Sequence, residues 1–137
     1  LRRSHVVKRR LDTVNGTTGV RNLDVRFAVS TEADVPVTAL PDAILPSQVR
    51  IKMRRSFRKG CWRYDLTRVW QAPTVVEAER LMAAKETSFE VEAECLCPDV
   101  MVGRLGFTEK DLATSVMMRG AELCRAAGKD ATMCLAE

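Results

Sequence analysis

The sequence contains no long apolar segment and no hydrophobic stretch of the kind found in secretory signal peptides. A helix that crosses a membrane needs about 20 consecutive, mainly apolar residues. The first five residues, Leu-Arg-Arg-Ser-His, are too highly charged for the start of a signal peptide. We therefore expect a protein that is neither inserted into a membrane nor exported.

Histidine is scarce, and the cysteines are not paired in sequence. His5 is the only histidine, and the five cysteines include no Cys-x-x-Cys pair. Zinc sites usually need such spacing, so we expect no zinc, and a nucleophilic Cys–His pair with His5 has no motif support. The cysteines are expected to be free thiols in a reducing compartment: Cys61, Cys95, Cys97, Cys124 and Cys134.

Charge of one sign is not in large excess either. The 22 lysines and arginines stand against 18 aspartates and glutamates, which gives a net charge of +4. This mild excess indicates local basic surfaces and does not favour a general nucleic-acid binder. With 137 residues the chain can bury one hydrophobic core but not two, so we expect a single domain over residues 1–137.

What the sequence does contain is a strict alternation of charged and apolar residues in several segments. Successive side chains of a β-strand point to opposite faces, so each such segment predicts a strand with one charged face. The charged faces hold Arg26 and Glu32 in residues 23–32, Arg50, Lys52 and Arg54 in residues 49–58, Arg63 and Asp65 in residues 61–69, and Glu90, Glu92 and Glu94 in residues 88–95.

Cations and anions are segregated between these segments. An ordinary antiparallel sheet with one wet face also alternates, but its polar face usually mixes residue types. Opposite charges would satisfy one another if the strands closed into a barrel with the charged faces inward. We therefore predict an α+β fold, an antiparallel β-barrel with a charged interior and helices packed outside. The alternative for the glutamate segment alone is the solvated face of an amphipathic strand.

Taken in order, these segments resemble the fungal and protozoal RNA 5′-triphosphatases that begin mRNA capping, within the triphosphate tunnel metalloenzyme family. Residues 90–94 resemble the family's Glu-x-Glu-x-Glu metal motif, and residues 50–56 its basic Arg-x-Lys-x-Arg-x-Ser strand. Residues 63–67 resemble its Arg-x-Asp-x-Thr strand. Residues 24–37 resemble a strand that ends in a functional glutamate, here Glu32, and Lys8 begins a similar Lys-Arg element.

The resemblance implies a nuclear enzyme that removes the γ-phosphate from the 5′-triphosphate end of nascent RNA. It implies a divalent metal, Mg²⁺ or Mn²⁺, held by Glu90, Glu92 and Glu94, and it makes the capping guanylyltransferase a candidate partner. The catalytic residues it implies are Glu32, Arg50, Lys52, Arg54, Arg63 and Asp65. The phosphate-binding residues it implies are Lys8, Arg26, Arg50, Lys52, Arg54 and Arg63.

One family motif has no counterpart in this sequence. The family has an N-terminal Glu-x-Glu strand that completes the metal site, and no such pair precedes Lys8. We therefore expect part of a longer protein, with an incomplete tunnel and an incomplete metal site. Two alternatives stay open: a tunnel phosphatase acting on inorganic tripolyphosphate or nucleoside triphosphates, and a non-catalytic remnant that binds phosphate or RNA.

Two helices are expected, with turns at residues 15–19 and a connector at residues 36–46. Residues 73–85 carry a modest apolar stripe. A longer helix begins at the cap Thr108 and ends at Gly128. We expect its apolar face to cover the outward Phe89 and Val91, while a partner-binding helix is the alternative.

Overall fold

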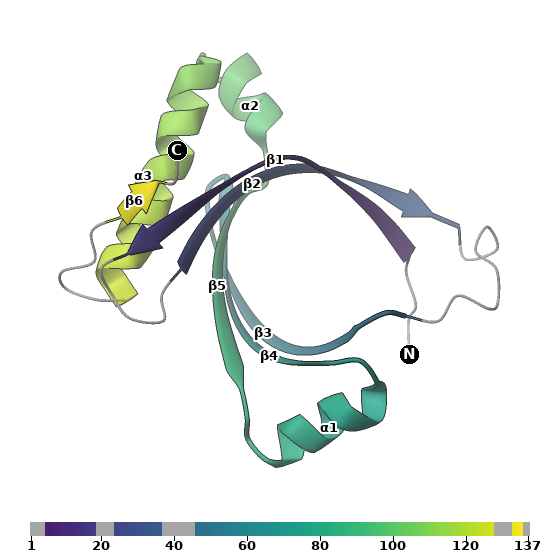
Figure 1. The fold of residues 1–137 in the computed structure, drawn as a ribbon. Coiled ribbons are helices and arrows are strands. Elements are labelled where there is room, and N and C mark those ends of the chain that lie inside the picture. The colour runs from purple at the N-terminus through teal and green to yellow at the C-terminus, as the bar shows by residue number, and fades with distance from the viewer. Residues whose placement is uncertain (1–4, 19–23, 37–45, 128–132, 136–137) are drawn as a thin grey trace. The chain divides into compact units, whose positions relative to one another are not determined.

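The computed structural model describes residues 5–18, 24–36, 46–127 and 133–135 (Figure 1). It is α+β, and its strands form two antiparallel three-stranded sheets, in the orders β2-β1-β6 and β3-β4-β5. The elements are β1 (His5–Thr18), β2 (Asp24–Val35), β3 (Val49–Lys59), β4 (Trp62–Ala72), α1 (Val75–Ala83), β5 (Ser88–Cys95), α2 (Pro98–Gly103), α3 (Glu109–Ala127) and β6 (Met133–Leu135).

The α+β class and the antiparallel pairing are thus confirmed, but no closed barrel is found within the described ranges. The chain divides into two compact units, one made of Leu1–Ile44 and Ser115–Glu137, the other of Leu45–Thr114. That these units form one domain stays a prediction. None of the described helices is long and apolar enough to cross a membrane.

In the first unit, β1 lies between β2 and β6. Its register with β2 shifts between Arg10 and Asp12, which marks a bulge. Residues 15–18 were predicted to form a turn but continue β1, because both neighbouring strands pair with this stretch. The predicted connector at residues 36–46 lies mostly outside the described residues.

The described part of α3 that belongs to the first unit packs on β2. Gly120 of the helix lies so close to Phe27 that a Cβ atom there would stand 2.5 Å from the ring. Phe89 and Val91 belong to the second unit, where they are 74% and 53% exposed, and the expectation that this helix covers them stays a prediction. The strand of Phe27 and the strand of Phe89 both have an apolar face. The sequence alone does not say which of the two the helix contacts.

The start of α3 was predicted correctly. The Thr108 hydroxyl accepts a hydrogen bond from the Asp111 amide at 3.1 Å, and Asp111 accepts one from the Thr108 amide at 2.9 Å. These reciprocal bonds satisfy two of the amides that a helix leaves unpaired at its N-terminus. The predicted stop at Gly128 lies outside the described residues.

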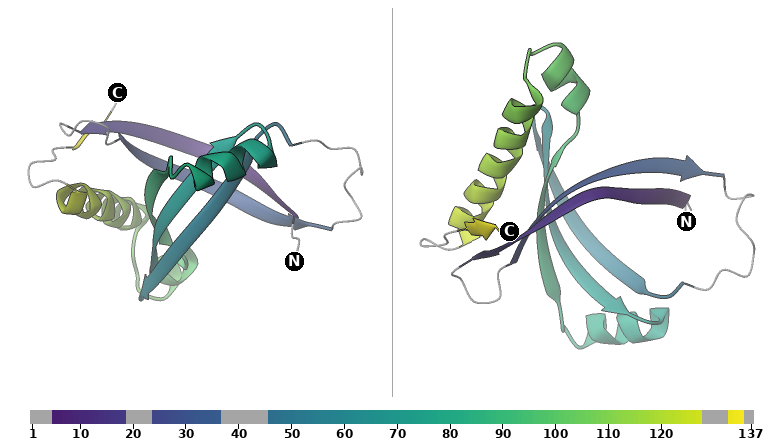
Figure 2. Two further views of the ribbon diagram at one scale, coloured as in Figure 1. Left: turned by 90° about the horizontal axis from the view of Figure 1, so that it is seen from below. Right: turned by 45° about the horizontal axis from the view of Figure 1, so that its top comes forward.

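The second unit is a β3–β4 hairpin extended by β5. Gly60 forms the turn with a φ of +59°, a conformation that glycine adopts at little cost. After β4, α1 begins at Thr74, whose hydroxyl accepts a hydrogen bond from the Glu77 amide. Helix α1 packs against β4 and β3 (Figure 2). Its Ala78 is fully buried.

A disulfide between Cys61 and Cys97 ties the hairpin turn to the start of α2, with 5.4 Å between the Cα atoms. The expectation of free thiols is therefore wrong for this pair, whereas Cys95 and Cys124 are free. Trp62 pairs with Cys95 in the β4–β5 ladder. Cys61 precedes Trp62 and Cys97 follows Cys95 by two residues, so this pairing brings the two cysteines close together. Sequence spacing does not reveal this proximity, because it arises from the strand register.

Candidate active site

Most charged residues of β3, β4 and β5 lie on one side of the sheet, whereas Arg55, Lys59 and Arg68 lie on the other. We call the first side the charged face, and it includes Arg50, Lys52, Arg54, Ser56, Arg58, Arg63, Asp65, Thr67, Glu90, Glu92 and Glu94. The other side, the apolar face, includes Met53, Leu66, Trp70, Phe89 and Val91. Strand alternation and the observed register together place these residues, so the predicted cationic and glutamate strands do share one face.

Arginines on β3 reach over the central strand to glutamates on β5. Arg50 pairs with Glu90, and the Nη2 atom of Arg54 lies 3.2 Å from an Oε2 atom of Glu92. Because β4 separates these two strands, the arginine side chains extend across it.

Arg63 completes this row of ion pairs from β4. It pairs with Glu94, its direct neighbour in the β4–β5 ladder. Each of the three predicted metal-binding glutamates is therefore bound to a different arginine.

Asp65 is the centre of this arrangement. Its Oδ2 atom lies 3.1 Å from Nη1 of Arg54 and 3.1 Å from Nε of Arg63. Burial raises the pKa of this carboxyl group, but a hydrogen bond with Ser56 and the charges of Arg54 and Arg63 outweigh that effect. The net result is a pKa below the usual value of an aspartate side chain, so Asp65 is ionised at neutral pH.

The charged face is buried only along its central strand, because most of its side chains on β3 and β5 are exposed. Asp65 and Thr67 are each only 2% exposed, while Leu66 between them, on the apolar face, is 47% exposed. Arg54 contributes to this burial, since its Nε donates to the Thr67 hydroxyl at 3.3 Å. The polar side chains in the middle of β4 are therefore buried under longer side chains of the same face. That this face lines the interior of a barrel stays a prediction.

Lys52 differs from the arginines around it. Among the residues that the structure describes, no carboxylate lies within ion-pair distance of its amine, and Val69 is opposite it on β4. Lys52 thus supplies positive charge that the charged face itself does not neutralise.

The remaining predicted site residues belong to the first unit. Lys8 and Glu32 are opposite one another on β1 and β2, and their side chains form an ion pair of 3.0 Å. Arg26 lies on the same face of β2 as Glu32, and its Nε donates to Asn15 at 3.1 Å. Asn15 was not predicted as a contact, because the bulge in β1 sets the register that brings it there.

Carboxylate oxygens are the ligands that Mg²⁺ and Mn²⁺ prefer. Within the part of the chain that the structure describes, however, no group of three or more His, Cys, Asp or Glu side chains could hold a metal ion. Glu90, Glu92 and Glu94 point to one face but are engaged by separate arginines. These carboxylates could therefore supply some of the ligands of a divalent ion, but they do not form a complete metal site by themselves.

Comparisons with known proteins give one match. Residues 2–111 match the model of a family described as mRNA capping enzyme, beta chain. No curated protein and no solved structure matches the chain. The matched range includes every predicted site residue, from Lys8 to Glu94.

Proposed function

Because the chain belongs to the family of the mRNA capping enzyme beta chain, we propose that it is an RNA 5′-triphosphatase. In this reaction a water oxygen bonds to the γ-phosphorus of a 5′-triphosphate RNA end. The bond from that phosphorus to the oxygen bridging it to the β-phosphate breaks. The products are a 5′-diphosphate RNA end and inorganic phosphate, and one proton is released.

The observation that carries this proposal is the dense row of cations on the charged face. Phosphoryl transfer depends mainly on positioning and on the neutralisation of phosphate charge. Arg50, Arg54 and Arg63 offer planar guanidinium groups that bind two phosphate oxygens at once. No nucleophilic side chain is needed.

The glutamates on β5 hold the phosphate-binding arginines in position when no substrate is bound. Arg50 and Arg54 are held across β4 by Glu90 and Glu92, so their positive ends are already oriented above the central strand. A triphosphate would replace the carboxylates as the partner of these arginines. Donors that are positioned before the reaction need little reorganisation when charge develops.

Lys52 is the cation we assign to first contact with the phosphates. Within the described residues it forms no ion pair that a phosphate would have to replace, in contrast to Arg50 and Arg54 on the same strand. Its compact ammonium group acts as a point charge, which suits a mobile terminal phosphate.

We also propose a divalent ion, Mg²⁺ or Mn²⁺, as cofactor. When bound, such an ion neutralises phosphate oxygens and polarises the group that is transferred. Glu90, Glu92 and Glu94 would supply part of its ligands. The support is the carboxylate chemistry of this strand and its resemblance to the family's metal motif.

The inverted barrel remains part of the proposal. Glu32, Lys8 and Arg26 share one charged face of β1 and β2, just as the other site residues share one face of their sheet. In a barrel with both faces inward, Glu32 would orient the attacking water, and Lys8 and Arg26 would add phosphate contacts. The family further suggests nuclear mRNA capping as the setting and the capping guanylyltransferase as a partner.

Phosphate release tests the proposed reaction. The complete gene product is supplied with 5′-triphosphate RNA, inorganic tripolyphosphate or ATP, each with and without Mn²⁺. We expect Mn²⁺-dependent release, fastest from the RNA. Faster release from tripolyphosphate or ATP would favour a general tunnel phosphatase, and no release from any substrate would favour a non-catalytic remnant.

A further inference from the structure

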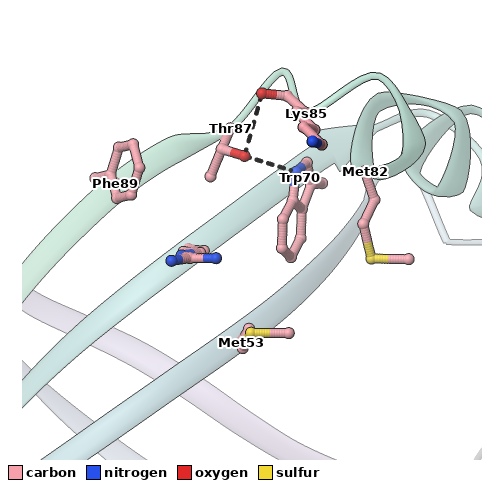
Figure 3. Close-up of a pocket in the computed structure, with 7 residues that line it drawn as sticks. Met53, Trp70, Met82, Lys85, Thr87 and Phe89 are labelled. Atoms are coloured by element: carbon pink, nitrogen blue, oxygen red, sulfur yellow. Dashed lines mark hydrogen bonds between the residues drawn. The ribbon is translucent and has the colours of Figure 1, made fainter.

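The apolar face holds a pocket that the proposed hydrolysis does not use. Its volume is about 470 Å³, and it is lined by Met53, Arg68, Trp70, Met82, Lys85, Thr87 and Phe89 (Figure 3). These residues come from all three strands of the sheet, from α1 and from the connection that follows it. The pocket therefore lies on the opposite side of this sheet from the charged face.

The apolar lining of this pocket combines one buried, fixed side chain with two exposed ones. Trp70 is buried, and its Nε1 donates to the Thr87 hydroxyl at 3.1 Å, which fixes the indole ring (Figure 3). Met53 and Phe89 are 59% and 74% exposed. A large exposed aromatic ring beside a fixed, apolar floor is typical of a surface that receives another apolar group.

The charges at this pocket are all positive. Arg68 and Lys85 line it, and no acidic residue does. Every acidic residue of β3, β4 and β5 lies on the charged face instead. Within the described ranges neither Arg68 nor Lys85 has an ion-pair partner, so both cations are available to a negatively charged ligand.

Lys85 occupies a position at which the backbone favours glycine. Its φ is +59°, and it follows α1 in a Schellman motif, in which the Glu86 amide donates to Leu81 and the Lys85 amide to Met82. Local structure therefore does not explain a lysine here. Its charge at the edge of the pocket gives it a use in binding.

We propose that this pocket binds an acidic peptide segment of a partner protein, with an aromatic or aliphatic side chain as its anchor. The anchor would enter between Met53, Trp70 and Phe89, and carboxylates beside it would pair with Arg68 and Lys85. The unbranched methionine side chains adapt easily to the shape of an apolar anchor.

Two other occupants fit less well. RNA would need exposed rings for stacking, but of the two aromatic residues that line the pocket Trp70 is buried and Phe89 alone exposes its ring. A second copy that docked through the same face would bring like charges together at Arg68 and Lys85, which opposes association. The chemistry of the pocket thus favours an acidic protein segment.

A displayed library of random peptides, selected on the full chain, tests this proposal. The peptides that are enriched should combine Asp or Glu with Phe, Leu or a similar anchor. By fluorescence anisotropy their affinity should fall about tenfold or more in Phe89→Ala and in Arg68→Glu. Lys85→Gly removes a charge while suiting the backbone, so it should weaken binding without loss of thermal stability.

The matched control is Lys110→Glu, which makes the same charge change as Arg68→Glu on an exposed residue outside the pocket. It should bind the selected peptides as the unchanged chain does. Failure to enrich any peptide, enrichment of basic peptides, or equal binding by all variants would overturn the proposal. So would tighter binding of a 5′-hydroxyl RNA that Arg68→Glu abolishes, or self-association that Phe89→Ala abolishes.

Discussion

Asp65 is the residue on which the order of the charged face depends most. It is buried, it binds both Arg54 and Arg63, and its pKa lies below the usual value of an aspartate side chain. An aspartate with a lowered folded-state pKa stabilises the protein above its unfolded-state pKa. That contribution is lost as the pH falls through the folded-state value.

Asp65→Asn should therefore destabilise the protein at pH 7 and make its stability less sensitive to acid. Loss of charge-assisted hydrogen bonds to two arginines is expected to cost about 1–3 kcal/mol. Urea unfolding at pH 7 and at about pH 3 measures this difference. If the variant and the unchanged chain lose the same stability between these pH values, the ionised Asp65 does not support the fold.

Lys52 has a different role at the same scale. It has no partner within the described residues, so Lys52→Ala should leave stability nearly unchanged. Triphosphate hydrolysis should nevertheless fall about tenfold or more, since removing a contact to developing charge costs about 2–4 kcal/mol. Initial rates of phosphate release, with Lys59→Ala as control, measure this effect. A rate within about twofold of the unchanged chain would remove Lys52 from the site.

At the scale of elements, the contact between α3 and β2 is made by a glycine. Gly120 allows the helix to approach Phe27, and a Cβ atom there would stand 2.5 Å from the ring. Alanine is favoured over glycine inside a helix by about 1 kcal/mol, whereas overpacking costs about 1–3 kcal/mol.

A double-mutant cycle separates these two effects. Gly120→Ala should lower stability in the unchanged chain but raise it in a Phe27→Ala background, where the ring is absent. Thermal and urea unfolding of the four proteins give the coupling energy. A stabilising Gly120→Ala in both backgrounds would show that helix and strand do not meet at this glycine.

The disulfide is the other feature that joins elements. Cys61 and Cys97 are 36 residues apart, and a link across such a loop stabilises a protein by about 2–4 kcal/mol. Cys97→Ser should lower the unfolding temperature under oxidising conditions and have no effect in a strong reductant. Cys95→Ser is the matched control, because Cys95 is free. Equal unfolding temperatures for Cys97→Ser and the unchanged chain under oxidising conditions would contradict the disulfide.

At the scale of the whole molecule, the sequence predicted the strands of the site well. Charge alternation located β5 at Ser88–Cys95 as observed, and placed Arg54, Asp65 and Glu92 on one side. Period-two patterns are local, so one sequence suffices to read them.

Features set by long-range register were missed. They include the Cys61–Cys97 disulfide, the short elements α2 and β6, and the contact of α3 with Phe27. The barrel and the metal site also depend on how distant strands meet. Neither follows from alternation alone, and both stay predictions.

The central claim is that the charged face of β3–β5 acts on triphosphate, and two neighbouring arginines test it most directly. Arg54 and Arg55 have the same charge on the same strand but point to opposite faces. The measurement is the initial rate of γ-phosphate release from 5′-triphosphate RNA by Arg54→Ala and Arg55→Ala, with folding checked by circular dichroism. We predict a loss of about tenfold or more for Arg54→Ala and a rate within about twofold of the unchanged chain for Arg55→Ala. Equal rates in the two variants would contradict the account.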